Sequence, residues 1–139
     1  LPLSDYLVDN GRSLTGDQYY TPGSVHSLKI ESGSPLTHGL EDRLDVMISH
    51  SPLFALGPGA ESLGVKRLGW FDTDRPLRSG WAWGQERMQG GIALIEAKLG
   101  DGELFLFTPR ITFRSQSHAA FPLLFNGIFY GSADDEPIF

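Results

Sequence analysis

The stretch "IALIEAKLGDGELFLFTP", residues 92–109, decides the fold, because it carries the clearest local pattern in the chain. In its first arm the apolar positions 93, 95, 97 and 99 share one face, while Glu96 and Lys98 face the other way. The turn "GDG" supplies residues that tolerate a positive φ, as a hairpin requires. The second arm, Leu104 to Phe107, is apolar on both faces, which predicts a central strand in a sheet covered on two sides.

The segment that follows this hairpin has the spacing of a helix. Phe121, Leu124, Phe125 and Ile128 fall at i, i+3, i+4 and i+7, which predicts that these four side chains form its buried face. Pro122 fits only the first turn, so the helix is expected to begin near residues 119–122, with Ser117 as a candidate cap. Gly131 is placed to end it.

Upstream of the hairpin, the chain is divided into short pieces by many of its 17 glycines and 9 prolines, which favours strands and turns. "VHSLKI", residues 25–30, predicts a half-buried strand with His26, Leu28 and Ile30 on one face, and "GVKRLGWF", residues 64–71, predicts another. We therefore expect one α+β domain over residues 1–139, with a mixed, mostly antiparallel sheet and a C-terminal helix.

Composition narrows the function classes. The net charge of −6, with only three scattered lysines, argues against nucleic acid and against a membrane surface, and no apolar run is long enough to span a bilayer. The absence of cysteine excludes a disulfide, a thiolate nucleophile and a thiolate metal site. We expect no cofactor.

One motif in the sequence has the spacing of metal ligands. "HGLE", His38 to Glu41, has the His-x-x-Glu spacing that zinc carboxypeptidases use for two ligands, and His118 could nominally supply a third. The motif lies in a turn, with no rigid element to aim both ligands at one ion. We therefore predict no metal ligands, and the histidines are expected to occupy turns or strand ends.

A polar corner precedes the expected helix. Arg110, Arg114, Gln116 and His118 lie between a strand and a helix N-terminus, where backbone N–H groups favour anions. Three interpretations stay open: the side chains brace the strand–helix joint, they bind an anion or carboxylate, or His118 serves a hydrolase. No catalytic residue is assigned, because no carboxylate nearby is an obvious partner to orient His118.

A second candidate ligand site is aromatic. In "SGWAWGQERMQG", residues 79–90, Trp81 and Trp83 are two apart and would share a strand face, with polar side chains just beyond. Indoles beside polar groups can bind sugars or peptides, although core aromatics are the alternative reading.

A family resemblance covers residues 19–131. The run from Arg78 to Ser132 contains Ser79-Gly80-Trp81 with Gly84, then Arg114, Gln116 and His118, then Phe121, Leu123, Leu124, Phe125 and Asn126. This pattern resembles the C-terminal end of large bacterial proteins of the zinc carboxypeptidase family, in which a peptidase domain precedes a class I glutamine amidotransferase-like domain.

The resemblance implies the later half of an amidotransferase-like three-layer α/β domain, without the cysteine nucleophile of a working amidotransferase. It implies a non-catalytic accessory domain for positioning, assembly or substrate contact, a partner in an upstream peptidase domain, and a secreted or periplasmic location. A small-ligand module for an anion, sugar or peptide and a histidine-dependent hydrolase are the alternatives. If the later half stands alone, an exposed apolar sheet edge could promote homo-oligomers.

Overall fold

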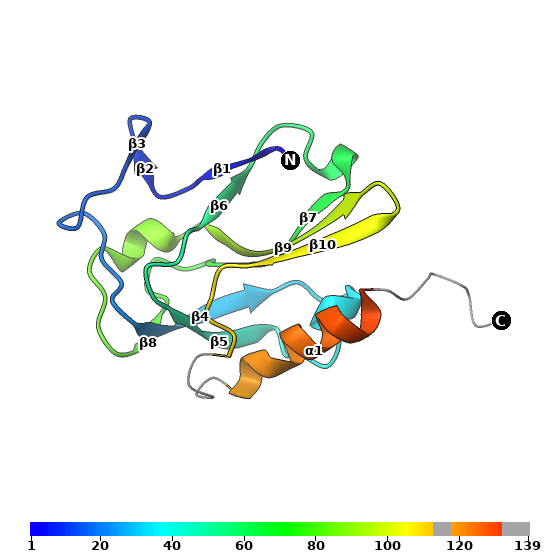
Figure 1. Ribbon diagram of the computed structural model, residues 1–139. Coiled ribbons are helices and arrows are strands. Elements are labelled where there is room, and N and C mark those ends of the chain that lie inside the picture. The colour runs from blue at the N-terminus through cyan, green and yellow to red at the C-terminus, as the bar shows by residue number, and fades with distance from the viewer. Residues whose placement is uncertain (113–117, 132–139) are drawn as a thin grey trace.

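The structure is a computed structural model that describes residues 1–112 and 118–131. One eight-stranded sheet dominates it, and a single α-helix packs against the sheet (Figure 1). Every strand pairing among the described residues is antiparallel. The expected α+β class, with an antiparallel sheet and a C-terminal helix, is therefore confirmed. The strands are β1 Leu3–Asp5, β2 Val8–Asp9, β3 Arg12–Ser13, β4 Ser24–Ile30, β5 Arg43–Ile48, β6 Phe54–Leu56, β7 Val65–Trp70, β8 Leu77–Ser79, β9 Ile92–Leu99 and β10 Gly102–Phe107; the helices are α1 Phe121–Tyr130 and the short 3-10 turns η1 Pro35–Thr37, η2 Glu61–Leu63, η3 Gln85–Met88 and η5 His118–Ala120.

Strand β9 is the centre of the sheet. It pairs with β7 on one side and with β10 and the end of β6 on the other, within the order β1-β6-β9-β7-β4-β5. The predicted hairpin is confirmed, and Gly100 at its turn has φ 62°, a conformation that glycine adopts without a steric penalty. β2 and β3 form a separate two-stranded ribbon.

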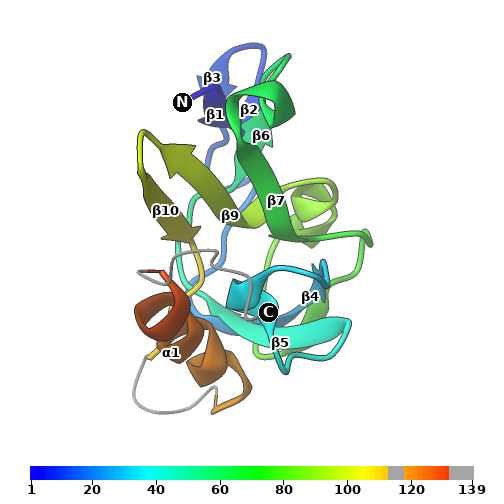
Figure 2. The same cartoon turned by 90° about the vertical axis from the view of Figure 1, so that its right-hand side faces the viewer.

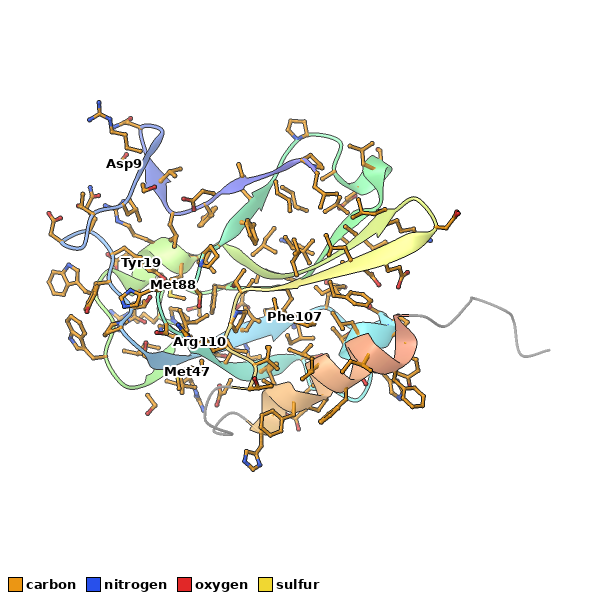
Figure 3. The ribbon with its side chains drawn as sticks, in the orientation of Figure 1. Asp9, Tyr19, Met47, Met88, Phe107 and Arg110 are labelled. Carbon is orange, nitrogen blue, oxygen red and sulfur yellow. The ribbon has the colours of Figure 1, made fainter. Side chains whose placement is uncertain are left out.

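The segment after β10 connects the β9–β10 hairpin to β5 at one end of the strand order. After β10 the chain turns toward β5, where the Arg110 amide donates to the carbonyl oxygen of Met47 at 2.9 Å (Figure 3). Helix α1 lies between β10 and β5, as Figure 2 shows. Two residues at this end of the chain belong to the larger core: Ala120, just before the helix, and Leu123, inside it. They pack with Leu28, Leu44 and Val46 of the strands.

A smaller core covers the other face of β9, formed by Ile95, Ala97, Val65 and their neighbours beneath β1 and β6. On β4 every second residue points inward, so that His26, Leu28 and Ile30 are buried together as predicted. The alternation follows from the pleat of a strand that has one face in the core.

The central position predicted for residues 104–107 is wrong, because β10 has β9 as its one strand partner among the described residues. The strand is apolar on both faces because each face meets a different core. Phe105 and Phe107 pack against the larger core, and Leu104 and Leu106 against the smaller one. Coverage of both faces therefore did not require a second neighbouring strand.

Helix α1 begins and ends where predicted, with Pro122 in its first turn and Gly131 at its C-cap. The candidate cap Ser117 lies outside the described residues. The predicted buried face is right in part: Phe121 and Leu124 are partly buried, and Leu124 packs against the larger core. It is wrong for Phe125 and Ile128, which are exposed, and the fully buried side chain is Leu123.

Gly127 lies on the side of the helix that faces the sheet, where a Cβ would stand at ordinary contact distance from Leu36, Phe105 and Phe107. The Asn126 side chain also donates to the carbonyl oxygens of Leu36 and His38, both at 2.9 Å, which fixes the helix against η1.

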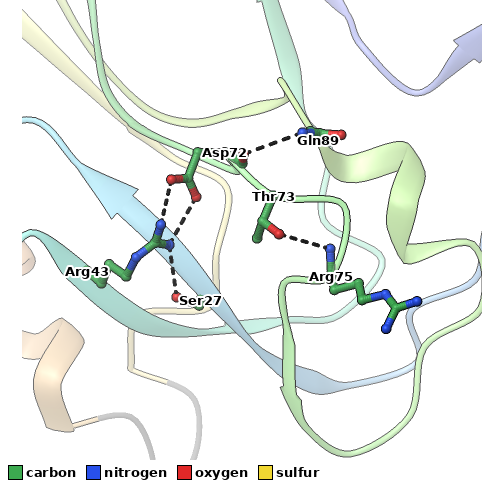
Figure 4. Close-up of polar contacts among 6 residues, drawn as sticks. All are labelled: Ser27, Arg43, Asp72, Thr73, Arg75 and Gln89. Atoms are coloured by element: carbon green, nitrogen blue, oxygen red, sulfur yellow. Dashed lines mark hydrogen bonds and ion pairs between the residues drawn. The ribbon is translucent and has the colours of Figure 1, made fainter.

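An ion pair ties β5 to the loop after β7 (Figure 4). Arg43 donates to both carboxylate oxygens of Asp72, at 3.0 and 2.5 Å, and to the hydroxyl of Ser27 at 3.4 Å. The guanidinium lowers the pKa of Asp72 below its usual value, chiefly through these hydrogen bonds. Within the described ranges, no helix has the length and apolar character needed to cross a membrane.

Candidate ligand-binding site

The two tryptophans named by the sequence lie just beyond β8, in a bend that begins at Gly80, where φ is 88°. The expectation that they share a strand face is wrong, because neither lies in a strand: β8 ends at Ser79, and Trp83 forms only an isolated antiparallel bridge with Tyr20. Both indoles are about half exposed, Trp81 at 54% and Trp83 at 55%. They are surface groups and do not belong to either core.

Tyr20 joins these tryptophans to a histidine from another loop. Its backbone exchanges two hydrogen bonds of 2.9 Å with Trp83, and its ring meets the edge of Trp81 at a centroid distance of 5.7 Å. The His50 ring is a second neighbour of the Tyr20 ring, with 5.3 Å between the two ring centroids. We call Tyr20, His50, Trp81 and Trp83 the aromatic surface.

Polar contacts hold Trp83 in place. Its indole N–H donates to the carbonyl oxygen of Asp17 at 2.6 Å, which orients the ring. The adjacent Gly84 has φ 73°, and a Cβ there would overlap the carbonyl oxygen of Gln18. Glycine is therefore required at residue 84 both for its backbone angle and for the close approach of the two loops.

The loop opposite is closed by its own side chains. The Thr15 amide donates to the side-chain oxygen of Gln18 at 3.0 Å, and the Thr15 hydroxyl donates to the carboxylate of Asp17. This last bond lowers the pKa of Asp17. Trp83 thus rests on a loop closed by its own hydrogen bonds, and little of the freedom of this ring is left for a ligand to remove.

Two hollows flank the bridge between Tyr20 and Trp83. One has a volume of about 250 Å³ and is lined by Tyr20, His50, Ser13 and Thr21 among others. The second, of about 450 Å³, is lined by Trp83 with Asp17, Gln18, Gln85 and Glu86 among others.

The charged side chains that line the two hollows are three acidic groups, Asp5, Asp17 and Glu86, and one basic group, Arg87. With His50 neutral these give a net charge of −2. Such a lining disfavours an anion and suits a neutral ligand with hydroxyl groups.

The polar corner is described only in part. Arg110 is exposed on the segment that meets β5, and the His118 ring stacks on Phe121 at 5.1 Å with an angle of 21°. Arg114 and Gln116 lie outside the described residues. His118 thus has a packing role at the start of α1. That the four polar side chains form one corner with a shared role stays a prediction.

The His-x-x-Glu motif follows η1 in an exposed turn. The His38 ring meets the edge of Tyr130 at 6.1 Å, so it packs on the end of α1. Across residues 1–112 and 118–131, no three metal-ligating side chains come together in a way that could hold an ion.

Sequence reasoning overlooked a buried pair, Ser24 and His26. The Ser24 hydroxyl lies 2.7 Å from Nε2 of His26, and both side chains are buried, with Nδ1 of the ring lacking a hydrogen-bond partner. Burial lowers the pKa of His26 to about 4. Because solvent does not reach this pair, it is a structural element of the core.

Sequence reasoning also did not identify Tyr20 and His50, which come from loops 30 residues apart and belong to no motif. Only the doublet Tyr19–Tyr20 in a loop of turn residues hinted at surface aromatics.

Neither a protein-family model nor a curated protein nor a solved structure matches this chain. The geometry of the aromatic surface is therefore the observation from which a function can be inferred, and membership of the carboxypeptidase family stays a proposal.

Proposed function

We propose that this chain is a non-catalytic accessory domain that binds a neutral saccharide through the aromatic surface. The observation that carries the proposal is the set of three exposed rings, Tyr20, Trp81 and Trp83, beside two polar hollows. Trp83 is hydrogen-bonded to Tyr20 and Asp17, and Trp81 packs on the ring of Tyr20. Buried aromatics would have packed a core, whereas these rings are 40% or more exposed.

A saccharide fits this surface better than the alternatives. The C–H face of a sugar ring stacks on indole and phenol rings, and its hydroxyls pair with amide and carboxylate groups such as those of Gln18, Gln85 and Glu86. The net acidic lining opposes a phosphate or carboxylate ligand. Two hollows side by side would accommodate neighbouring units of one oligosaccharide.

The larger context is part of the same proposal. The resemblance of residues 19–131 to the C-terminal part of zinc carboxypeptidase-family proteins supports a role as an accessory domain, partnered with an upstream peptidase domain in a secreted or periplasmic protein. Reading the gene upstream of the codon for Leu1 tests this context. A frame that encodes no peptidase domain would remove the carboxypeptidase context and leave the saccharide site standing.

Tryptophan fluorescence tests the binding site. Titration with neutral oligosaccharides should change the emission, whereas inorganic phosphate and short peptides should not. Trp81→Ala should weaken saccharide binding about tenfold or more, because an exposed aromatic anchor is removed without loss of a core contact.

The matched control is Trp70→Phe, since Trp70 lies elsewhere, beneath the guanidinium of Arg67 at 3.9 Å. This variant should bind like the parent chain. A flat response to every saccharide, or equal binding by the Trp81→Ala variant, would contradict the proposal.

A further inference from the structure

The backbone groups on the outer edge of β10 have no strand partner among the described residues. The Thr108 amide donates to Ala93 at 3.0 Å, and the Lys98 amide donates to Gly64 on the opposite side of β9 at 3.1 Å. Since bonded pairs alternate along antiparallel strands, these two bonds set the phase for the whole hairpin. The N–H and C=O groups of Glu103, Phe105 and Phe107 therefore point away from β9, where β10 has no strand partner among the described residues.

An apolar row on α1 lies next to this edge. Phe125, Ile128 and Phe129 are 61%, 69% and 77% exposed and share the helix face opposite Leu123. Contact between α1 and β10 is direct, since Gly127 and Gly131 approach the rings of Phe105 and Phe107. The three side chains expose on the order of 300–400 Å², approaching half of the roughly 800 Å² that each partner buries in a standard interface.

We propose that this edge and helix face pair two copies of the chain in a symmetric dimer. The β10 strands of the two copies pair antiparallel, with Phe105 opposite Phe105 on the two-fold axis. This register uses the outward backbone groups of residues 103, 105 and 107 in both copies. The two sheets join into one, and the axis keeps both α1 helices on the same face, where their exposed rows meet.

The residues of β10 favour a second copy as the occupant. In this register Glu103, the one charged residue of the strand, stands opposite Phe107, so like charges do not face each other. On the other face Leu104 stands opposite Leu106, which gives an apolar pair. A shift by two or four residues would leave some outward groups unpaired, and the larger shift would set Glu103 against Glu103.

Molar mass in solution, measured by light scattering after gel filtration, tests the dimer. The parent chain should have twice its monomer mass as its concentration rises. Glu103→Pro should leave a monomer, because it removes an outward N–H from an exposed edge position, whereas Glu103→Ala keeps that N–H and should dimerise.

Phe129→Glu provides a second variant that does not alter the strand. It should also lose the dimer, whereas the matched control Leu63→Lys should keep it, since η2 packs beside β7 on the far side of β9. A parent chain that stays monomeric throughout, or a dimer that survives both Glu103→Pro and Phe129→Glu, would overturn the proposal.

Amide hydrogen exchange tests the register. The amides of Glu103, Phe105 and Phe107 should become protected as concentration rises, while those of Leu104 and Leu106, which face β9, should be protected throughout. A dimer in which residues 103, 105 and 107 still exchange rapidly would overturn strand pairing in favour of contact through the helices alone.

Discussion

The aromatic surface and the helix–edge surface, the latter formed by Phe125, Ile128, Phe129 and the outer edge of β10, both expose large apolar side chains. They differ in what surrounds those side chains. Trp83 is bonded to Asp17 and Tyr20, and polar groups line the hollows beside it. The row on α1 is uniformly apolar, and it adjoins the outer edge of β10, whose backbone groups have no strand partner among the described residues. The difference teaches that exposure marks a contact surface, while its polar surroundings indicate which kind of ligand it suits.

Leu123→Ala should have the largest effect, because Leu123 is the fully buried side chain within α1. Its removal leaves a cavity in the larger core, and we expect a loss of about 4 kcal/mol in the free energy of unfolding. Urea denaturation measures it. Phe125→Ala, two residues away on the exposed face, should change stability by less than about 0.5 kcal/mol. Equal losses in the two variants would mean that the helix is rotated from the orientation described here.

Gly84→Ala should disrupt the aromatic surface and destabilise the fold. The added Cβ meets the carbonyl oxygen of Gln18 and forces a residue other than glycine to positive φ, so we expect a loss of about 3 kcal/mol. Gly39→Ala is the matched control, since Gly39 has φ 78° with open space around it and should lose only about 1 kcal/mol. Thermal unfolding curves compare the two, and a Gly84→Ala variant as stable as Gly39→Ala would contradict the close approach.

Acid should affect the stability of the whole fold through His26, which is buried on β4. The folded state holds this ring neutral, with its pKa lowered to about 4, while the unfolded chain binds the proton near the ordinary value of about 6.5. Stability is therefore lost as pH falls through this window, by about 2 kcal/mol between roughly pH 7 and pH 5.

Urea unfolding followed by tryptophan fluorescence and by helical circular dichroism should give one shared midpoint at each pH. The His26→Gln variant, which keeps a polar partner for Ser24, should lose this part of the pH dependence. Midpoints that separate in acid would show that the two surfaces do not belong to one cooperative unit.

Local patterns in the sequence predicted the elements well. The hairpin of β9 and β10, the inward row of β4 and the limits of α1 follow from alternation, turn residues and the positions of Pro122 and Gly131. These features depend on residues near one another in the chain, which is why a single sequence is enough to identify them.

Tertiary contacts decided what the sequence did not predict. The helix turns Gly127 toward Phe105 and Phe107 of the sheet and Phe125 to solvent, an orientation that the apolar spacing alone did not predict. The aromatic surface joins Tyr20, His50 and Trp81 across three loops, and no periodicity connects residues so far apart.

The position of α1 in the chain has a consequence for biosynthesis. A ribosome produces every strand of the sheet before it produces this helix, yet Leu123 completes the core that those strands share. Until residues 118–131 leave the exit tunnel, the inner face of the nascent strands lacks the Leu123 side chain. Closure of the core therefore follows the synthesis of every strand in the sheet, and the uncovered inner face is a surface on which a chaperone could act before then.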